Sequence, residues 1–434
     1  MQQTQTLELF IEPAQMGSYF TLPFSMPVDV ESFTIRYNYE RFHLGDTSNG
    51  FTPRTEINII DIGLISPDGR QVGASGSNKT EITLGPTVST PGFAVVPLTQ
   101  GTWQIMVGAY KIAPEGVNVT YELDFTPKHL RLLKGDFHTH TLGSDGILTV
   151  DELARHAMRH GLDFLAITDH NQFAPAVAFP QIPGITLIPG VEWTHYLGHS
   201  NFLGVDRPYA RPFPTNTPDE AADRFASARE NGALIVINHP FDEDVPFKFD
   251  FRTLPFDCIE IWNGPMRESN LRAVGLWHTL LAAGKKIPIV GGSDYHRDNL
   301  FQILGGPTTC VYAMSPSRED ILVALKAGHA YITFAPGGPT LEYTAGSAML
   351  GDSVHWADVK KMHIAVDGLL VGDKVNLVTR TGSETLFTAP AAGSFAIDRP
   401  VTEPGFARIE VHRVFLPGVP PLPALISNPI YFDA

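Results

Sequence analysis

The chain has 434 residues, of which 43% are hydrophobic and 18% charged, and its formal net charge is −15. This length exceeds what one ordinary compact core needs, so we expect two or three domains. Lys and Arg are scattered along the chain instead of forming a basic stripe. That distribution argues against a nucleic-acid surface or an anionic membrane as partner, because either would need a basic stripe.

The N-terminal stretch MQQTQTLELFIEPAQ has no basic region followed by an apolar run, so no signal peptide is expected. No window reaches ~18 uninterrupted apolar residues, so no membrane span is expected either. A cytoplasmic location follows if Met1 is the natural start, and a secreted one if a leader has been trimmed. Cys258 and Cys310 lie in strand-like runs and are interpreted as buried, reduced thiols.

Residues 1–128 predict an all-β domain. Five segments alternate apolar and polar residues between Pro, Gly, Asn and Asp turns: QTLELFIEP, ESFTIRYNYE, TEINIIDIGLISPDG, GTWQIMVGAY and NVTYELDFTP. This pattern is typical of a small antiparallel β-sandwich.

Residues 129–338 change character, because short apolar strands alternate with helical stretches. Seven strands are predicted, LLKGDFH, DFLAIT, ITLIPGVE, ALIVIN, CIEIW, IPIVGGSD and TTCVYA, with helices over 151–160, 218–231, 269–283 and 317–327. Thr149 and Glu152 form a capping box before the first helix. Such alternation predicts an α/β fold with a parallel sheet, open or closed into a barrel. From 339 to 434 strands dominate again, so a C-terminal β-domain is expected.

Polar side chains gather where the predicted strands end, which is where parallel α/β folds bind ligands. Six of the seven strand exits carry a metal-capable or hydrogen-bonding group, and GHSNFLG adds His199 on a short extra strand. The groups at the exits are His138 and His140; Asp169, His170 and Asn171; Glu192 and His195; His239; Asn263; and Asp294, His296 and Arg297.

The spacing of these residues suits metal binding. Side chains two apart on a strand point the same way, so His138 and His140 can hold one ion, as can Asp294 and His296. Glu192 offers two oxygens and could bridge two ions. Imidazole combined with carboxylate favours zinc, manganese or iron over calcium or magnesium.

Each of these residues also has a structural interpretation. A lone His-x-His is more often a surface or capping feature, and Asn263 could orient substrate or cap a turn. His156 and His160 lie four apart on the first helix, away from its apolar stripe, and are interpreted as a solvated face. The remaining histidines are interpreted as structural: His43, His129, His278, His329, His355, His363 and His412.

Taken together, four motifs resemble those of the PHP (polymerase and histidinol phosphatase) superfamily of metal-dependent hydrolases. They are HTHT…SDG, TDHN, NHP and SDYH, in the order of that family, and the resemblance covers residues 134–338. It implies a distorted seven-stranded (β/α)7 barrel, here flanked by N- and C-terminal β-sandwich-like domains. IPGVEWT, GHSNFLG, IEIWNG and GGSDYHR look most like the carbaryl-hydrolase-like (CehA/McbA) branch.

Carried over position by position, the resemblance implies two or three divalent transition-metal ions in three clusters. The first would be held by His138, His140, Glu192 and Asp294, and Glu192 would bridge to a second completed by His199 and His239. The third would be held by Asp145, His170 and His296. His199 is preferred to His195 as ligand, because GHSN matches the branch better, and His195 is then free to act near the substrate.

The mechanism that follows is hydrolysis by a hydroxide bridging the first two ions, with Asp294 accepting the proton of the water. His195, Tyr295 or Arg297 could assist the leaving group or hold an anionic substrate. Asn263 and Arg267 are further candidates for substrate binding.

A phosphoester is the leading substrate class, because several ions make a strong anion clamp. The strand-end loops are nevertheless poor in Lys and Arg and rich in aromatic residues, which leaves a carboxylic or carbamic ester or an amide as the alternative. A different class of function is a non-catalytic scaffold whose β-domains bind glycan or protein. Lost ligands would mark such a scaffold, and all nine are retained.

Overall fold

The computed structural model describes residues 3–45, 54–174 and 178–434. It divides into two compact units, Met1–His129 and Leu130–Ala434. The division after His129 lies next to the boundary expected at residue 128. The boundary expected at residue 338 stays a prediction, because the second unit continues through it.

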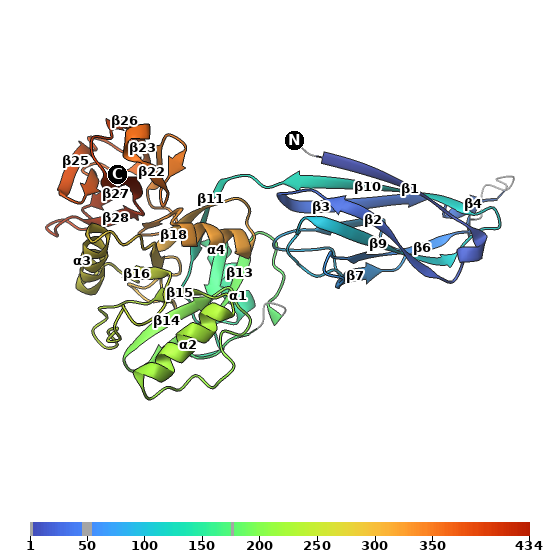
Figure 1. The fold of residues 1–434 in the computed structure, drawn as a ribbon, viewed down its shortest axis with the longest axis horizontal. Coiled ribbons are helices and arrows are strands. Elements are labelled where there is room, and N and C mark those ends of the chain that lie inside the picture. The colour runs from blue at the N-terminus through green and yellow to red at the C-terminus, as the bar shows by residue number, and fades with distance from the viewer. Residues whose placement is uncertain (1–2, 46–53, 175–177) are drawn as a thin grey trace. The chain divides into compact units, whose positions relative to one another are not determined.

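The first unit consists of strands and is shown in blue to teal in Figure 1. Two four-stranded antiparallel sheets, ordered β1-β10-β3-β8 and β2-β9-β6-β7, enclose one apolar core. The strands are β1 (Gln3–Ile11), β2 (Tyr19–Met26), β3 (Val30–Tyr39), β4 (Phe42–Leu44), β5 (Arg54–Glu56), β6 (Ile59–Ile65), β7 (Gln71–Ser75), β8 (Glu81–Leu84), β9 (Gly101–Lys111) and β10 (Val117–Pro127). Alternation of buried and exposed residues along these strands is what the sequence predicted.

In the second unit, each of the seven predicted strands is present. They are β11 (Arg131–Asp136), β12 (Phe164–Ile167), β13 (Thr186–His195), β15 (Leu234–Ile237), β16 (Cys258–Asn263), β17 (Ile289–Gly292) and β18 (Thr308–Ala313), and the short extra strand is β14 (Gly198–Leu203). The helices are α1 (Val150–Arg159), α2 (Pro218–Glu230), α3 (Glu268–Ala282) and α4 (Arg318–Ala327). The fold is therefore mixed α/β, with large sheets and few helices.

The expectation of a parallel sheet is correct only in part. β11–β12–β13 and β15–β16–β17 pair in parallel, but β14 is antiparallel to both of its neighbours and β18 is antiparallel to β11. The reason lies at Tyr196 and Leu197, a two-residue turn that folds β14 back along β13. Gly198 follows with φ of 135°, a conformation that an L side chain rarely adopts.

The strands after residue 330 extend this same sheet. Its order runs β17-β16-β15-β14-β13-β12-β11-β18-β19-β28-β27-β24-β25, where β19 is Ala330–Thr333, β24 Lys374–Thr379, β25 Gly382–Thr388, β27 Gly405–Arg413 and β28 Leu422–Ser427. A smaller sheet holds β20 (Thr340–Ala345), β21 (Ala348–Met349), β23 (Lys361–Leu369) and β26 (Gly393–Pro400), and β22 (Ser353–His355) pairs with β29 (Ile430–Asp433).

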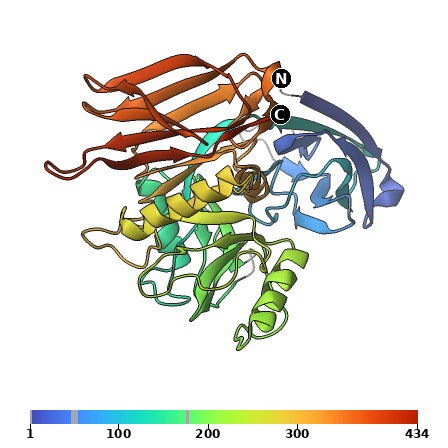
Figure 2. The same ribbon diagram turned by 60° about the vertical axis from the view of Figure 1, so that its left-hand side comes forward.

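Helix α3 joins the two parts of the second unit. Its Trp277 is buried in the same cluster as Phe406 and Ile426 from the C-terminal strands, and His278 Nδ1 accepts a 2.9 Å hydrogen bond from Arg408. Figure 2 shows this yellow helix running beneath the orange strands. Shared core explains why residues after 338 do not separate as a compact unit of their own.

Helix α1 begins as the sequence predicted. The Glu152 amide donates to the Thr149 hydroxyl oxygen at 3.3 Å and the Thr149 amide donates to the Glu152 carboxylate at 2.9 Å, which completes the capping box. Leu153, Ala154 and Ala157 are buried, whereas Met158 is 38% exposed. None of the described helices is long and apolar enough to span a bilayer.

Both cysteines are free and buried, as expected. Burial raises the pKa of the Cys310 thiol to about 12 and raises that of Cys258 as well. Because only the thiolate reacts, neither thiol should react with Ellman's reagent in the native protein, and both should react after denaturation. Rapid labelling of either residue in the folded protein would contradict its placement.

Candidate metal centre

The predicted ligands lie at the ends of neighbouring strands. The segments after β11 and β17 run side by side, because the Asp294 amide donates to the His138 carbonyl and the His140 amide donates to the Tyr295 carbonyl, each at 2.9 Å. A parallel bridge joins His170, just beyond β12, to Glu192 in β13. Backbone pairing thus brings together side chains that are more than a hundred residues apart in sequence.

Glu192 is fully buried, and histidines face both of its oxygens. Its Oε1 lies 3.2 Å from His138 Nε2, 3.1 Å from His199 Nδ1 and 3.4 Å from His239 Nε2. His199 reaches this carboxylate because the turn at residues 196–197 lays β14 against β13. The arrangement matches the donors implied for two of the three ions.

The second oxygen of Glu192 connects to the other donors. Oε2 lies 2.8 Å from His170 Nδ1 and 3.5 Å from His140 Nε2. The same His140 nitrogen lies 3.0 Å from Asp294 Oδ1, which is also 3.5 Å from His138 Nε2. The carboxylates of Glu192 and Asp294 therefore both face His138 and His140.

Asp145 lies at the outer edge of the site. Its Oδ1 is 3.1 Å from His296 Nε2 and 3.7 Å from His170 Nε2, and its side chain is 57% exposed. His140 completes this group of four potential donors. Because the Asp145 carboxylate is exposed, this group of donors is more open to solvent than the groups that contain Glu192.

All nine predicted ligands fall into four overlapping groups whose donor atoms lie within 4.8 Å of one another. Among the described residues, these groups are His140, Asp145, His170 and His296; His138, His140 and Glu192; His138, His239 and Asp294; and Glu192, His199 and His239. Such sets of imidazole and carboxylate fit divalent transition metals.

Several of these buried atoms make no hydrogen bond of suitable geometry, even where a partner lies close: His138 Nε2, His140 Nδ1, His239 Nδ1 and Glu192 Oε2. Buried polar atoms are normally paired, so a cation between them would satisfy what the protein does not. Burial opposes ionisation, but the facing histidines, His138 above all, hold the pKa of the Glu192 carboxyl well below its usual range. The residues thus fit divalent ions in both charge and donor type.

Backbone strain is concentrated at the same place. Four described residues other than glycine have positive φ, and three of them are Asn171, His239 and Asp294, with φ of 51°, 24° and 52°. Such conformations carry a cost and persist where the surrounding structure holds them. Two of the three are candidate ligands.

Sequence reasoning missed Glu260, a second carboxylate buried behind the ligands. It accepts the amide of His239 at 2.9 Å and Asn263 Nδ2 at 3.2 Å, and its Oε1 lies 3.0 Å from His138 Nδ1. Together with Asp294 and Glu192 it raises the pKa of His138, against the opposing effect of burial. An acidic residue inside the apolar run CIEIW was the available signal.

Two further buried groups shape the site without joining it. Asp136 accepts amide hydrogens from His138, Ser293 and Gly305 at 3.0–3.1 Å, and burial raises its pKa to about 6. Asp169, one of the polar groups at the strand exits, accepts the amide of Thr141 at 2.7 Å and so fixes the loop after His140.

Other predicted site residues lie elsewhere. His195 belongs to none of the donor groups found among the described residues. Its ring stacks on Trp193 at 5.3 Å, while Nε2 lies 3.2 Å from the Thr215 carbonyl and Nδ1 accepts the Leu197 amide at 3.0 Å. Both ring nitrogens contact backbone groups, so the His195 ring stabilises the hairpin of β13 and β14.

Tyr295 and Arg297 flank His296 but point to different surroundings. Tyr295 is 1% exposed and its ring packs 5.9 Å from that of His156, so it is part of the core. Arg297 is exposed. The face of α1 expected to be solvated is partly covered too, since the His156 side chain is 14% exposed and lies 3.3 Å from Asp298.

A cavity of about 390 Å³ opens beside the donors. Its walls are Asn263, Gly264, Pro265, Arg267, Asp294, His296, Asn299, Phe301 and Gln302. Arg267 is the cation among them, 3.2 Å from Asp242 and 3.3 Å from Asn263 Oδ1. The two predicted substrate-binding residues Asn263 and Arg267 therefore line a space next to two candidate ligands.

The chain was compared with protein families, curated proteins and solved structures. No family model matches the chain. A 54-residue segment, 12% of the chain, is 37% identical to the DNA polymerase/3'-5' exonuclease PolX of Bacillus subtilis, and the match spans 10% of that protein.

Three solved structures are similar to parts of this chain. A two-domain protein from Bacteroides vulgatus, described as containing a predicted PHP-like metal-dependent phosphoesterase, is 19% identical over 65% of this chain and 90% of its own, with a TM-score of 0.40. A candidate metal-dependent phosphoesterase from Bifidobacterium adolescentis is 17% identical over 44% and 94%, with a TM-score of 0.32. An amidohydrolase from Chromobacterium violaceum, with bound sulfate and no metal, is 17% identical over 38% and 89%, with a TM-score of 0.30.

The carbaryl-hydrolase-like branch stays a prediction.

Chelation should destabilise the protein if the donors hold ions. A ligand that binds only the folded state at about 100 times its Kd contributes roughly 2.7 kcal/mol, so removal of bound metal should lower Tm measurably. Differential scanning fluorimetry before and after chelation, and after adding back zinc or manganese, measures this. A Tm indifferent to both treatments would contradict the metal centre.

Replacing Glu260 by Gln should weaken metal binding without removing a ligand. Partners that orient ligating histidines typically contribute about 10–100-fold in affinity, so a loss of that size is expected. Metal titration measures it, with Glu342→Gln as the control, because Glu342 is an exposed residue of β20. Equal affinities in the two variants would assign Glu260 a purely structural role.

Proposed function

We propose that the chain is a metal-dependent hydrolase of the PHP type. The observation that carries the proposal is the convergence of nine His, Asp and Glu donors around Glu192 at the strand ends. A distorted (β/α)7 barrel, flanked by β-sandwich-like domains, is the proposed architecture. The backbone bonds between the segments after β11 and β17 support it, because they join the first and sixth of the seven predicted strands.

Two or three divalent ions, of zinc, manganese or iron, are the proposed cofactors. His138, His140, Glu192 and Asp294 would hold one, and Glu192, His199 and His239 a second. Asp145, His170 and His296 would hold a third, with His140 alongside. When bound, such ions lower the pKa of a water and stabilise charge that develops on a substrate.

Asp294 is the proposed general base. One of its oxygens faces His140 at 3.0 Å, and the other accepts a hydrogen bond from Asn263 Nδ2 at 3.3 Å. Asp294 also lines the cavity, so its carboxylate is within reach of a water beside a bound substrate. Asn263 is thereby a positioning residue as well as a substrate-binding candidate.

A phosphoester is the proposed substrate class. Arg267 offers a guanidinium in the cavity next to Asp294 and His296, a suitable partner for a phosphate oxygen. Phe301, 77% exposed at the rim, supports the alternative of a carboxylic or carbamic ester or amide with an apolar group. In both cases the proposed partner is a small molecule, and neither a nucleic acid nor a membrane. The proposed location is the cytoplasm.

An activity panel separates these substrate classes. The metal-reconstituted protein should hydrolyse p-nitrophenyl phosphate or a p-nitrophenyl phosphodiester, measured by absorbance at pH 7–8. If turnover is confined to a p-nitrophenyl or naphthyl ester and carbamate, the alternative holds and the phosphoesterase proposal fails.

Asp294→Asn should keep the fold and lose nearly all turnover. The amide retains the shape of the carboxylate but cannot accept the proton of the water, a loss expected to be at least about 10²-fold in kcat. Asp367→Asn, in β23, serves as control. Activity retained in Asp294→Asn, with unchanged circular dichroism and metal content, would show that the base lies elsewhere.

The scaffold alternative predicts that the protein does not bind transition metal, whereas the hydrolase proposal predicts that it does. Protein purified without chelator should contain transition metal by elemental analysis, and Glu192→Gln should reduce it while His363→Gln, an exposed residue of β23, should not. Less than one equivalent of metal, unrestored by reconstitution, would favour a non-catalytic scaffold.

A further inference from the structure

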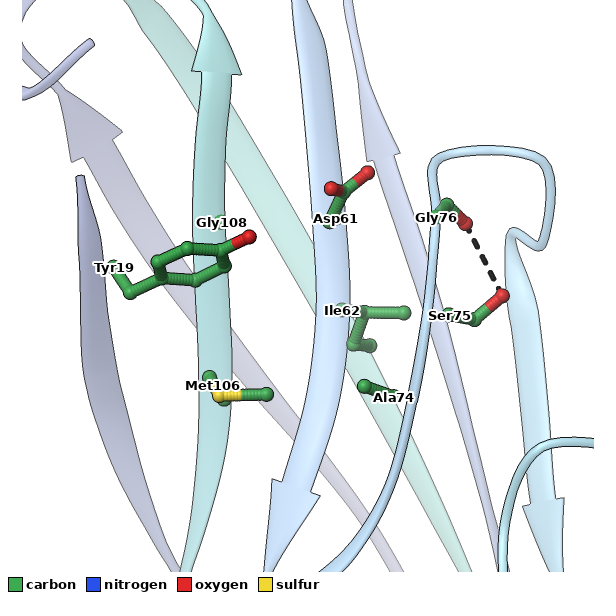
Figure 3. A pocket seen from close by; sticks show the side chains of 8 residues that line it. All are labelled: Tyr19, Asp61, Ile62, Ala74, Ser75, Gly76, Met106 and Gly108. Carbon is green, nitrogen blue, oxygen red and sulfur yellow. Dashed lines mark hydrogen bonds between the residues drawn. The ribbon is translucent and has the colours of Figure 1, made fainter. Parts of the chain in front are cut away.

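The sheet β2-β9-β6-β7 of the first unit carries a cavity of about 370 Å³. The unit that holds it contains none of the nine candidate metal ligands. The cavity is lined by Tyr19, Asp61, Ile62, Ala74, Ser75, Gly76, Met106 and Gly108 (Figure 3). Its chemistry is therefore separate from the hydrolase site proposed above.

Small residues form the floor of this cavity. Gly108 lies directly between Tyr19 and Asp61 in the registers of β2, β9 and β6. A Cβ at Gly108 would come within 2.8 Å of the Tyr19 ring and 3.1 Å of Asp61 Cβ. In the next row, a Cβ at Gly63 would come within 2.4 Å of the end of Met106. Larger residues would fill the hollow.

Tyr19 provides an aromatic platform over this floor. Its ring extends across β9 above Gly108 in Figure 3, yet the residue is 72% exposed, so much of the ring is open to solvent. An exposed aromatic ring over a glycine floor offers a stacking surface to a ligand.

Hydrogen-bonding groups lie on the other side of the hollow. A Cβ built on Gly76 would lie 3.7 Å from Asp61 Oδ1 and 3.8 Å from Asn78 Oδ1. The Ser75 hydroxyl lies 3.2 Å from the Gly76 carbonyl and 3.4 Å from Asn78 Oδ1. These groups are chiefly acceptors, so they favour a ligand that donates hydrogen bonds.

The combination selects a ligand class. Among the described residues lining the cavity none is cationic and one is a carboxylate, which disfavours an anion. An open aromatic face beside several spaced acceptors suits a ring with apolar C–H groups on one side and hydroxyl donors at its edge. We propose that this cavity binds a pyranose unit of a neutral carbohydrate, with Tyr19 stacking on the sugar and Asp61 accepting from its hydroxyls.

Binding of neutral hexasaccharides to the full-length protein tests this proposal. The panel consists of β-1,4-glucan, α-1,4-glucan, xylan, mannan and chitin oligomers, measured by isothermal titration calorimetry and saturation-transfer NMR. At least one should bind, and Tyr19→Ala should weaken it by about tenfold or more, because the stacking surface is lost. Tyr19→Trp should retain binding.

Matched variants separate the site from general effects. Tyr196→Ala removes a 92% exposed tyrosine of the second unit and should leave sugar binding unchanged. Asp61→Asn should weaken binding, and neither Tyr19→Ala nor Asp61→Asn should change metal content. The proposal is overturned if no hexasaccharide binds, or if Tyr19→Ala binds the hexasaccharide as tightly as the unaltered protein does. It is also overturned if the unaltered protein binds the cation tetramethylammonium instead of a sugar and Tyr19→Ala loses that binding.

Discussion

A fully buried carboxylate, Glu192, is the feature on which the second unit depends. A charge removed from water is costly unless polar or charged groups surround it, and here five imidazoles lie 2.8–3.5 Å from its oxygens. Those imidazoles come from segments after β11, β12 and β15 and from β14. The strands around Glu192 must therefore all be in place for its burial to be compensated. Unpartnered buried atoms in the same cluster indicate that the protein alone does not complete this compensation.

Three buried carboxylates hold the segments that carry these donors in position. Glu260 fixes His138 and the amide of His239, Asp136 collects amides from the segments after β11 and β17, and Asp169 holds the loop beyond His140. Metal ligands in proteins are commonly oriented by such outer carboxylates. The cavity with Arg267 and Phe301 is lined by Asp294 and His296 as well, so it directly adjoins two of the candidate ligands.

Much of this could be predicted from the sequence, and the failures have physical reasons. Strands and helices followed from hydrophobic period and capping, and most candidate ligands from polar residues at strand exits, whereas Asp145 came from the resemblance alone. The direction of β14 could not be read from its composition, because a two-residue turn at 196–197 decides it. His195 was expected to act near the substrate once His199 was preferred as the ligand, and its backbone contacts at Thr215 and Leu197 are features that its sequence position does not reveal. Glu260 escaped notice because burial inside an apolar strand hides its partners. The continuity of the core through Phe406 and Trp277 is likewise a long-range property.

The hairpin of β13 and β14 also bears on how the site assembles. Glu192 and His199 are 7 residues apart, whereas His140 and Asp294 are 154 apart. Closing a short loop costs less conformational entropy than closing a long one, so half of one ion site can form locally and early. Its completion needs only His239, which follows β15, whereas the donors His138, His140 and Asp294 must wait until β17 reaches β11. Metal bound at the two groups would then report two successive stages in the closing of the chain.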